Sequence, residues 1–183
     1  MSEERIEDAR DLAGPPDGFQ RLWTPHRMAY IKAEKPADDA EEECPFCSAP
    51  SKGDEDGLIV HRGEHCFVVL NLFPYNPGHV LICPYRHVPL YLDLTDEETA
   101  EFTRLTQQAM RAIQRASAPH GFNLGMNQGA VAGAGVAAHR HQHVVPRWGG
   151  DANFITIIGD SKVLPQLLRD TRQLLASAWE QLP

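Results

Sequence analysis

Three histidines at alternate positions are the feature that most constrains this chain. Residues 139–148 read His-Arg-His-Gln-His-Val-Val-Pro-Arg-Trp. Because alternate side chains of a β-strand share a face, a strand here would place His139, His141 and His143 in one row, with roughly 6.5–7 Å between neighbours. A helix would scatter the three rings, and the Val-Val-Pro that follows favours a strand. Such a row suits a phosphate chain running past several imidazoles, or a metal held at one end.

A histidine run also has ordinary explanations. An expression tag has contiguous histidines at a terminus, whereas this run is internal and interleaved with other residues. A surface tract that binds metal, or a chance cluster of surface histidines, would also give such a run, and the pattern by itself does not decide between them.

Length and composition place the chain among soluble globular proteins. Its 183 residues are enough for one domain with a core, and 42% hydrophobic and 23% charged residues are ordinary values. No apolar run approaches the ~20 residues of a membrane span, and the N-terminus lacks the apolar segment of a secretory signal, which predicts a cytoplasmic protein without a membrane partner. A net charge of −8 argues against nucleic-acid binding, although local donors can still bind a nucleotide.

The chain is expected to divide into an N-terminal arm with an acidic linker (1–43) and a folded domain (44–183). The first segment is acidic and ends in three consecutive glutamates, which is typical of a solvated stretch. Trp23 and Tyr30 within it are expected to anchor the arm onto the domain.

Local patterns predict several strands and two helices. Besides the histidine segment, four segments are expected to form strands: 58–60, 66–72, 80–84 and 122–128. Thr95 followed by Glu98 is a capping box, so a helix should begin there, with an apolar stripe over 102–116 that covers one face of a sheet. Residues 163–182 are expected to form an amphipathic C-terminal helix.

Cys44-Pro-Phe-Cys47 provides half of a metal site. Two thiolates on a tight turn suit tetrahedral zinc. The redox alternative, a thioredoxin-like motif, requires a βαβ context that the surrounding sequence does not offer. Four cysteines are too few for a disulfide scaffold, so the missing ligands are sought among the nine histidines.

The sequence resembles the histidine triad (HIT) superfamily of nucleotide hydrolases and transferases. The pattern His139-x-His141-x-His143-Val-Val is similar to its signature, and the longer string 139–154 resembles a bacterial branch that includes diadenosine tetraphosphate phosphorylases. The resemblance extends from about Leu22 to the C-terminal helix. It implies an α+β fold in which one long helix packs on an antiparallel sheet of about five strands, followed by a C-terminal helix, usually doubled in a homodimer.

The resemblance implies roles for the triad. His141 is expected to attack the α-phosphorus of an adenine nucleotide or dinucleoside polyphosphate, giving a nucleotidyl-histidine, because an imidazole of ordinary pKa about 6.5 is largely a free base at pH 7. His143 is expected to bond to phosphate or to the leaving group. In zinc-bearing members a histidine after the third strand and the first triad histidine complete the ligand set, which implies a structural zinc and no organic cofactor. The matching residues are Cys44, Cys47, His87 and His139.

Nucleotide contacts are implied as well. Asn71 is expected at the ribose and His79 near the phosphates, unless His79 only braces its loop. The loop 129–135 consists of small residues that let backbone N–H groups approach an anion. The contacts expected there are Asn127, Gly133, Ala134 and Gly135. Trp148 either lines the base pocket, within the chain or across a dimer interface, or packs at an interface.

One departure from the family leaves the acceptor open. Relatives have Gln-Ser, Gln-Thr or Gly-Ser where this chain has Ala134-Gly135, so a hydroxyl donor to phosphate is absent and the acceptor is water or orthophosphate. The predicted function is cleavage of a nucleotide phosphoanhydride by a hydrolase, nucleotidyltransferase or phosphorylase. The alternatives are a nucleoside phosphoramidate hydrolase, a nucleotide-binding regulatory module with little turnover, and a histidine-rich metal-handling protein. His143 disfavours the galactose-1-phosphate class of transferases, which carries glutamine there.

Overall fold

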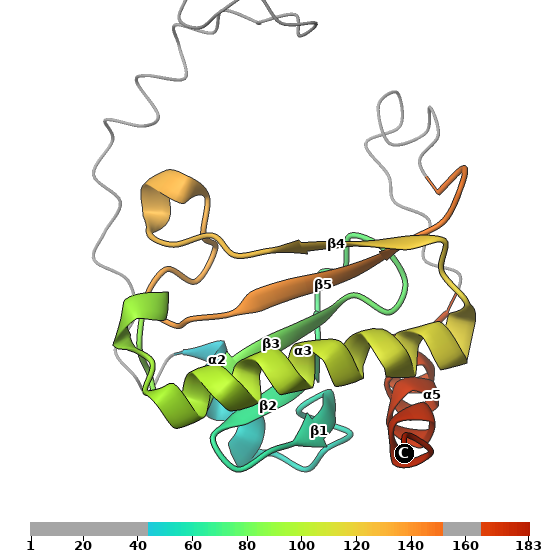
Figure 1. Ribbon diagram of the computed structural model, residues 1–183, viewed down its shortest axis with the longest axis horizontal. Helices are drawn as coiled ribbons and strands as arrows, with labels where there is room; N and C mark the ends of the chain where they lie inside the picture. The colour runs from blue at the N-terminus through green and yellow to red at the C-terminus, as the bar shows by residue number, and fades with distance from the viewer. Residues whose placement is uncertain (1–43, 152–165) are drawn as a thin grey trace, which may run out of the picture. The chain divides into compact units, whose positions relative to one another are not determined.

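The computed structural model describes residues 44–151 and 166–183, and these contain one antiparallel five-stranded sheet in the order β1-β2-β3-β5-β4 (Figure 1). The strands are β1 (Ile59–Arg62), β2 (Cys66–Leu70), β3 (Val80–Pro84), β4 (Gly121–Gly125) and β5 (Gln142–Arg147). The helices are α2 (Pro45–Ser48), α3 (Asp96–Ser117) and α5 (Leu168–Glu180), with 3-10 turns η3 (Ala49–Ser51), η4 (Tyr91–Asp93) and η5 (Ala130–Ala132). This is the expected α+β architecture. The expected arm, with Trp23 and Tyr30, lies outside the described residues.

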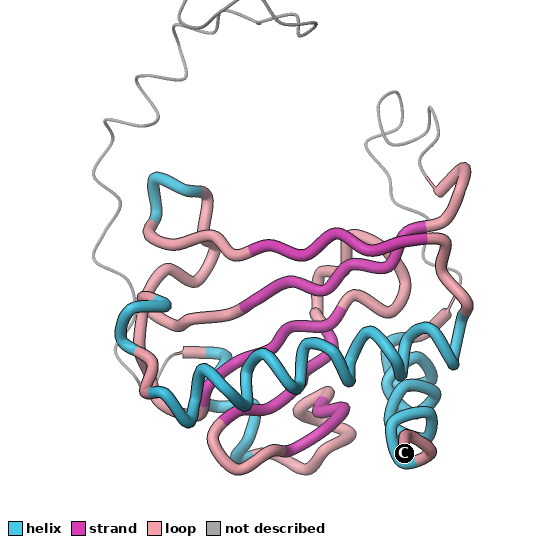
Figure 2. Tube along the Cα trace, viewed as in Figure 1, coloured by secondary structure: helices cyan, strands magenta, loops and turns pink. Residues whose placement is uncertain are grey.

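The central strands β2 and β3 are buried along their whole length because both faces of the sheet are covered. In β2, Val68 and Leu70 join the core beneath α3, while Phe67 and Val69 join a second cluster on the opposite face. Residues two apart share a face of a strand, so each strand supplies both clusters. Figure 2 shows α3 running along one face of the sheet. Cys66 is a core residue, as expected.

The long helix α3 begins at the expected capping box. The Thr95 hydroxyl accepts from the Glu98 backbone N–H at 3.3 Å, and the Glu98 carboxylate accepts from the Thr95 N–H at 2.8 Å. The helix ends at Ser117, and its C-cap residue Ala118 is left-handed (φ 45°) and precedes Pro119. The apolar stripe packs on the sheet. Within the described ranges no helix is both long and apolar enough to cross a membrane.

The C-terminal helix α5 packs against both α3 and β1. The Trp179 ring stacks on His61 with 4.5 Å between ring centroids, and Arg172 Nε donates to the Ile59 carbonyl at 2.7 Å. Leu175 is buried on the same helix. The sequence predicts a helix over 163–182, and its first three residues fall outside the described ranges, so the confirmed part begins at Leu168.

The strand of the triad begins later than the sequence predicts. β5 starts at Gln142, so only the third histidine of the triad belongs to the ladder. The ladder between β3 and β5 ends at the pair Ile82–Gln142, two residues before Pro84 at the end of β3, and proline has no N–H to donate to a ladder. The Arg140 N–H donates to the Val88 carbonyl instead, at 2.6 Å. The first two histidines therefore precede the strand in irregular backbone.

Candidate active site

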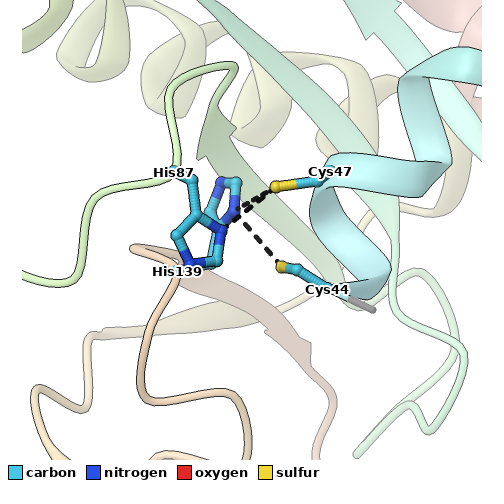
Figure 3. Close-up of side chains that lie close together, drawn as sticks. All are labelled: Cys44, Cys47, His87 and His139. Atoms are coloured by element: carbon cyan, nitrogen blue, oxygen red, sulfur yellow. Dashed lines mark hydrogen bonds between the residues drawn. The ribbon is translucent and has the colours of Figure 1, made fainter. Parts of the chain in front are cut away.

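Two cysteines and two histidines converge beside α2 (Figure 3). Their ligand atoms all lie within 4.8 Å of one another: Cys44, Cys47, His87 and His139. Cys47 Sγ is 3.1 Å from His87 Nδ1, and His139 Nδ1 is 3.4 Å from each sulfur. α2 begins directly after Cys44 with a proline at its first position, so one helical turn brings Cys47 back beside Cys44.

The orientation of His139 is fixed by the end of β3. Its Nε2 lies 2.9 Å from the Pro84 carbonyl oxygen, which can only accept, so Nε2 carries the proton and Nδ1 presents a lone pair to the thiols. Burial lowers the pKa of His139 to about 4, so the ring is neutral at pH 7. Two cysteine sulfurs and two imidazole nitrogens are the donor set of a closed structural zinc site, and the cluster fits that metal.

His141 keeps one ring nitrogen unprotonated. Its Nδ1 lies 2.8 Å from the His139 carbonyl oxygen, so Nδ1–H donates and Nε2 retains its lone pair. The ring lies against Phe46 of α2, with 4.9 Å between centroids. Burial lowers the pKa of His141, which favours the neutral ring. A neutral imidazole with a bare nitrogen has the chemistry of a nucleophile.

His143 is held by a chain of hydrogen bonds that begins in the loop after β2. The Tyr75 backbone N–H donates to His79 Nδ1 at 3.1 Å, and Asn71 Nδ2 lies 3.2 Å from the same atom. The proton of His79 is therefore on Nε2, which donates to His143 Nδ1 at 3.0 Å. This leaves the proton of His143 on Nε2. Burial lowers the pKa of His143 to about 4, so its ring is a neutral donor at pH 7.

A pocket of about 410 Å³ opens beside the triad. Apolar side chains form much of its wall, among them Phe46, Leu58, Val69 and Leu81. Four of the polar side chains that line it were expected from the sequence: Asn71, Asn127, His141 and His143. An apolar hollow with a few convergent polar groups is typical of a site for a small organic ligand.

The loop between β4 and β5 borders this pocket. Gly129 and Gly133 have φ of 80° and 84°, a backbone conformation that favours glycine. Asn127 Nδ2 donates to the Gly133 carbonyl at 3.2 Å, which ties the loop to the end of β4. Gly133 and Gly135 line the pocket, whereas Ala134 is buried and is not part of the lining. Of the expected loop residues, Asn127 lines the pocket together with Gly133 and Gly135, and the two glycines can offer only backbone groups to a ligand.

Comparison with known proteins agrees with this geometry. The HIT domain family matches residues 52–150. The chain belongs to the HIT family. The AP-4-A phosphorylase of Mycobacterium tuberculosis is 56% identical over 175 residues, which cover 93% of this chain and 89% of that protein.

Solved HIT structures share the fold. A Zn-bound histidine triad family protein from Mycobacterium smegmatis aligns with a TM-score of 0.61 and 26% identity, covering 78% of this chain and 96% of that one. A histidine triad nucleotide-binding protein from Sulfolobus tokodaii also gives a TM-score of 0.61 and 26% identity, covering 75% of this chain and 92% of that one.

Two residues expected at the nucleotide, His79 and Trp148, are not part of the lining of the pocket beside the triad. His79 is fully buried behind His143 and does not line the pocket, as expected of a residue that braces its loop. Trp148 lines a separate hollow of about 420 Å³, and its Nε1 donates to the Ser117 carbonyl at 3.3 Å. Trp148 therefore does not line the pocket beside the triad within the described chain.

Two aromatic residues at the site were not predicted from the sequence. Phe46 contacts His139 and His141 with centroid separations of 5.5 and 4.9 Å, and Tyr75 stacks on His143 at 5.7 Å. Both occupy segments that the sequence marks for other reasons, since Phe46 stands between the two cysteines and Tyr75 lies in the loop before His79. An aromatic residue between two metal-ligand cysteines, or in a loop that leads to a site histidine, is the sequence signal from which these two contacts could have been predicted.

Proposed function

We propose that this protein cleaves a phosphoanhydride bond of diadenosine tetraphosphate through a nucleotidyl-histidine intermediate. The observation that carries the proposal is the bond from His141 Nδ1 to the His139 carbonyl, which leaves the Nε2 lone pair on a residue that lines a pocket of nucleotide size. Similarity to the AP-4-A phosphorylase of Mycobacterium tuberculosis supports this choice of substrate.

In the first step His141 Nε2 attacks the α-phosphorus. An N–P bond forms, the bond from that phosphorus to its bridging oxygen breaks, and ATP departs. His143 donates a hydrogen bond from Nε2 to the departing oxygen as negative charge develops on it. Backbone N–H groups of the loop at Gly133 and Gly135 stabilise charge on the non-bridging oxygens. Each group acts without changing its resting tautomer.

In the second step an oxygen of orthophosphate attacks the same phosphorus. The N–P bond breaks, ADP forms and the free imidazole of His141 returns. Water in place of orthophosphate gives AMP. Because Ala134 brings no hydroxyl and its side chain is turned into the protein, the acceptor is held by backbone N–H groups and by the histidines.

The metal cluster supports the nucleophile and takes no part in the chemistry. Cys44, Cys47, His87 and His139 would hold zinc, and a closed structural site supplies rigidity rather than an open position for substrate. His139 is also the residue whose carbonyl accepts from His141. Fixing His139 therefore fixes the tautomer and the direction of the nucleophile.

We also propose a cytoplasmic homodimer that forms along the edge of the sheet. Within the described residues β4 has a neighbouring strand on one side only. Leu124 on this strand is half exposed, and Met126 beyond it is partly exposed. An edge strand with exposed apolar residues favours pairing with a second copy. Sedimentation velocity measures the mass in solution.

Product analysis on diadenosine tetraphosphate tests the proposed reaction. With orthophosphate, wild type should yield ADP and ATP in equal amounts. His141→Ala should abolish turnover and retain binding, because the pocket walls stay in place. His65→Ala, a partly exposed histidine outside the pocket, is the matched control and should keep full activity. Wild-type turnover by His141→Ala would contradict the mechanism, and AMP plus ATP without phosphate dependence would make the protein a hydrolase.

A further inference from the structure

Arg140 is a buried cation without a carboxylate partner among residues 44–151 and 166–183. The residue is 1% exposed, and the groups that favour its charged form are Cys83 and Tyr91, a thiol and a phenol that are ordinarily uncharged at pH 7. Other arginines of the described chain pair with an aspartate or glutamate, among them Arg62, Arg86, Arg104, Arg147 and Arg172.

The guanidinium of Arg140 binds two backbone carbonyls at the site. Nη2 donates to the His141 carbonyl at 2.6 Å, and Nη1 donates to the Asn127 carbonyl at 3.3 Å. Nε is buried and has no partner within the described chain. The side chain thus connects the backbone of the nucleophile to Asn127, two residues before the glycine-rich loop. Two carbonyl dipoles leave most of a full positive charge uncompensated.

Stability of the fold alone gives no reason for a charge at this position. Burying an ion without a partner destabilises the folded state, and a well-packed apolar side chain is often at least as favourable. The pocket lining, in turn, provides little positive charge for a polyanion. Lys52 is its one lysine or arginine within the described residues, it is exposed, and Asp56 in the same lining offsets it.

We propose that Arg140 is a positioning residue that supplies the positive charge for binding the phosphates at the triad, acting through space and through the two carbonyls it fixes. The inference rests on the proposed function, because it needs phosphates in the pocket. A charge in a dry interior acts over several ångströms with little screening by salt. In agreement, the charge of Arg140 adds to burial and to His141 in lowering the pKa of His143.

A pair of ligands that differ only in charge isolates this role. Isothermal titration of wild type and Arg140→Met with AMP and with adenosine compares a phosphorylated and an uncharged nucleoside. We expect Arg140→Met to bind AMP about tenfold more weakly or worse, with adenosine affinity unchanged. Arg140→Lys keeps the charge and should retain most of the AMP affinity, while Arg140→Gln, which keeps an amide donor without charge, should behave like Met.

Arg111→Met is the matched control, because it removes the same charge from an exposed position on α3. It should leave both affinities unchanged. An AMP-to-adenosine affinity ratio equal to that of wild type in Arg140→Met would overturn the proposal, as would equal weakening of both ligands. If Arg140→Met does not fold, the proposal is overturned when Arg140→Lys and Arg140→Gln have the same ratio of AMP to adenosine affinity.

The same experiment separates this inference from the proposed function. A wild-type protein that binds neither ligand and does not turn over diadenosine tetraphosphate would contradict the proposed function, and the role of Arg140 would fall with it. If the wild-type protein turns over the dinucleotide but the Arg140 variants keep the wild-type ratio of AMP to adenosine affinity, only the role of Arg140 is contradicted.

Discussion

The two ends of the histidine triad are held by different chemistry. At one end His139 faces two thiols and a second imidazole that together fit a metal. At the other end His143 accepts a hydrogen bond from His79, which is itself fixed by the Tyr75 backbone N–H. Both arrangements leave a neutral ring with its proton on a known nitrogen, and the nucleophile stands between them.

The difference lies in what each end depends on. The metal end joins Cys44 to His139, which are 95 residues apart, and so it ties the start of the domain to the active site. The hydrogen-bonded end begins with two residues eight apart, Asn71 and His79, in one loop. Loss of the first end should therefore affect stability of the whole domain, and loss of the second should affect turnover.

Removal of one metal ligand should have the largest effect. Cys44→Ala is expected to abolish the binding of one zinc ion per chain and to lower the free energy of unfolding by at least about 3 kcal/mol. The reason is that zinc would bind only the folded site, so its binding free energy adds to the stability of the fold. Urea unfolding and metal analysis measure both. Cys66→Ala is the matched control, a buried thiol outside the cluster, and should keep its zinc. Similar small losses from the two variants would show that the cluster is not a structural metal site.

A change at the opposite end should spare the metal. His79→Ala is expected to lower kcat about 100-fold, since His143 loses the bond that sets its proton, while zinc content and KM stay close to wild type. Asn71→Ala leaves the Tyr75 N–H donor to His79 in place, so its kcat should fall less. Steady-state kinetics with metal analysis decides the matter. Loss of zinc from His79→Ala would mean that the two ends are not independent.

The smallest effect is expected at an ion pair that supports the metal end. Arg86, next to His87, donates twice to Glu98 at 2.6 Å and holds the pKa of that carboxyl below its usual value. This contribution is fully present above the unfolded-state pKa and is lost as pH falls through the lower folded-state pKa. Glu98→Gln should therefore lower Tm by about 2–4 °C at pH 7, and the difference from wild type should shrink as the pH falls below the ordinary glutamate pKa of about 4.3 and vanish below the lower folded-state pKa.

Thermal unfolding across pH gives this comparison. Glu97→Gln, one residue away and outside the pair with Arg86, serves as the control for a lost charge at the start of α3. A Tm difference between Glu98→Gln and wild type that persists unchanged into acid would show that the ion pair is not its source.

The parts of the fold that were predictable have local signals. Thr95 and Glu98 define the start of α3 within one turn, and the predicted strand over 80–84 coincides with β3. The two cysteines of the metal cluster form a motif that the sequence shows directly, its two histidines followed from a resemblance to known proteins, and the structure brings the four ligand atoms together.

The rest depends on register between strands that are far apart in sequence. Leu81 pairs with His143, and His79, two residues before Leu81, shares its face and so reaches His143. The alternation of residue types within one strand does not determine which residues of another strand it pairs with. The late start of β5 likewise depends on where its ladder with β3 ends, at the pair Ile82–Gln142, and the sequence of the triad segment alone does not show this.

Phe46 links the metal cluster to the pocket. It stands between Cys44 and Cys47 in the first turn of α2 and its ring lies against His141, so the segment that would hold the ion also forms a wall of the pocket. We therefore expect a molecule that loses the metal to lose this wall of the pocket as well. Partial depletion of metal should then yield a mixture of fully active and inactive molecules rather than a population of uniformly lower activity. The activity of a sample would be proportional to the fraction of its chains that carry metal.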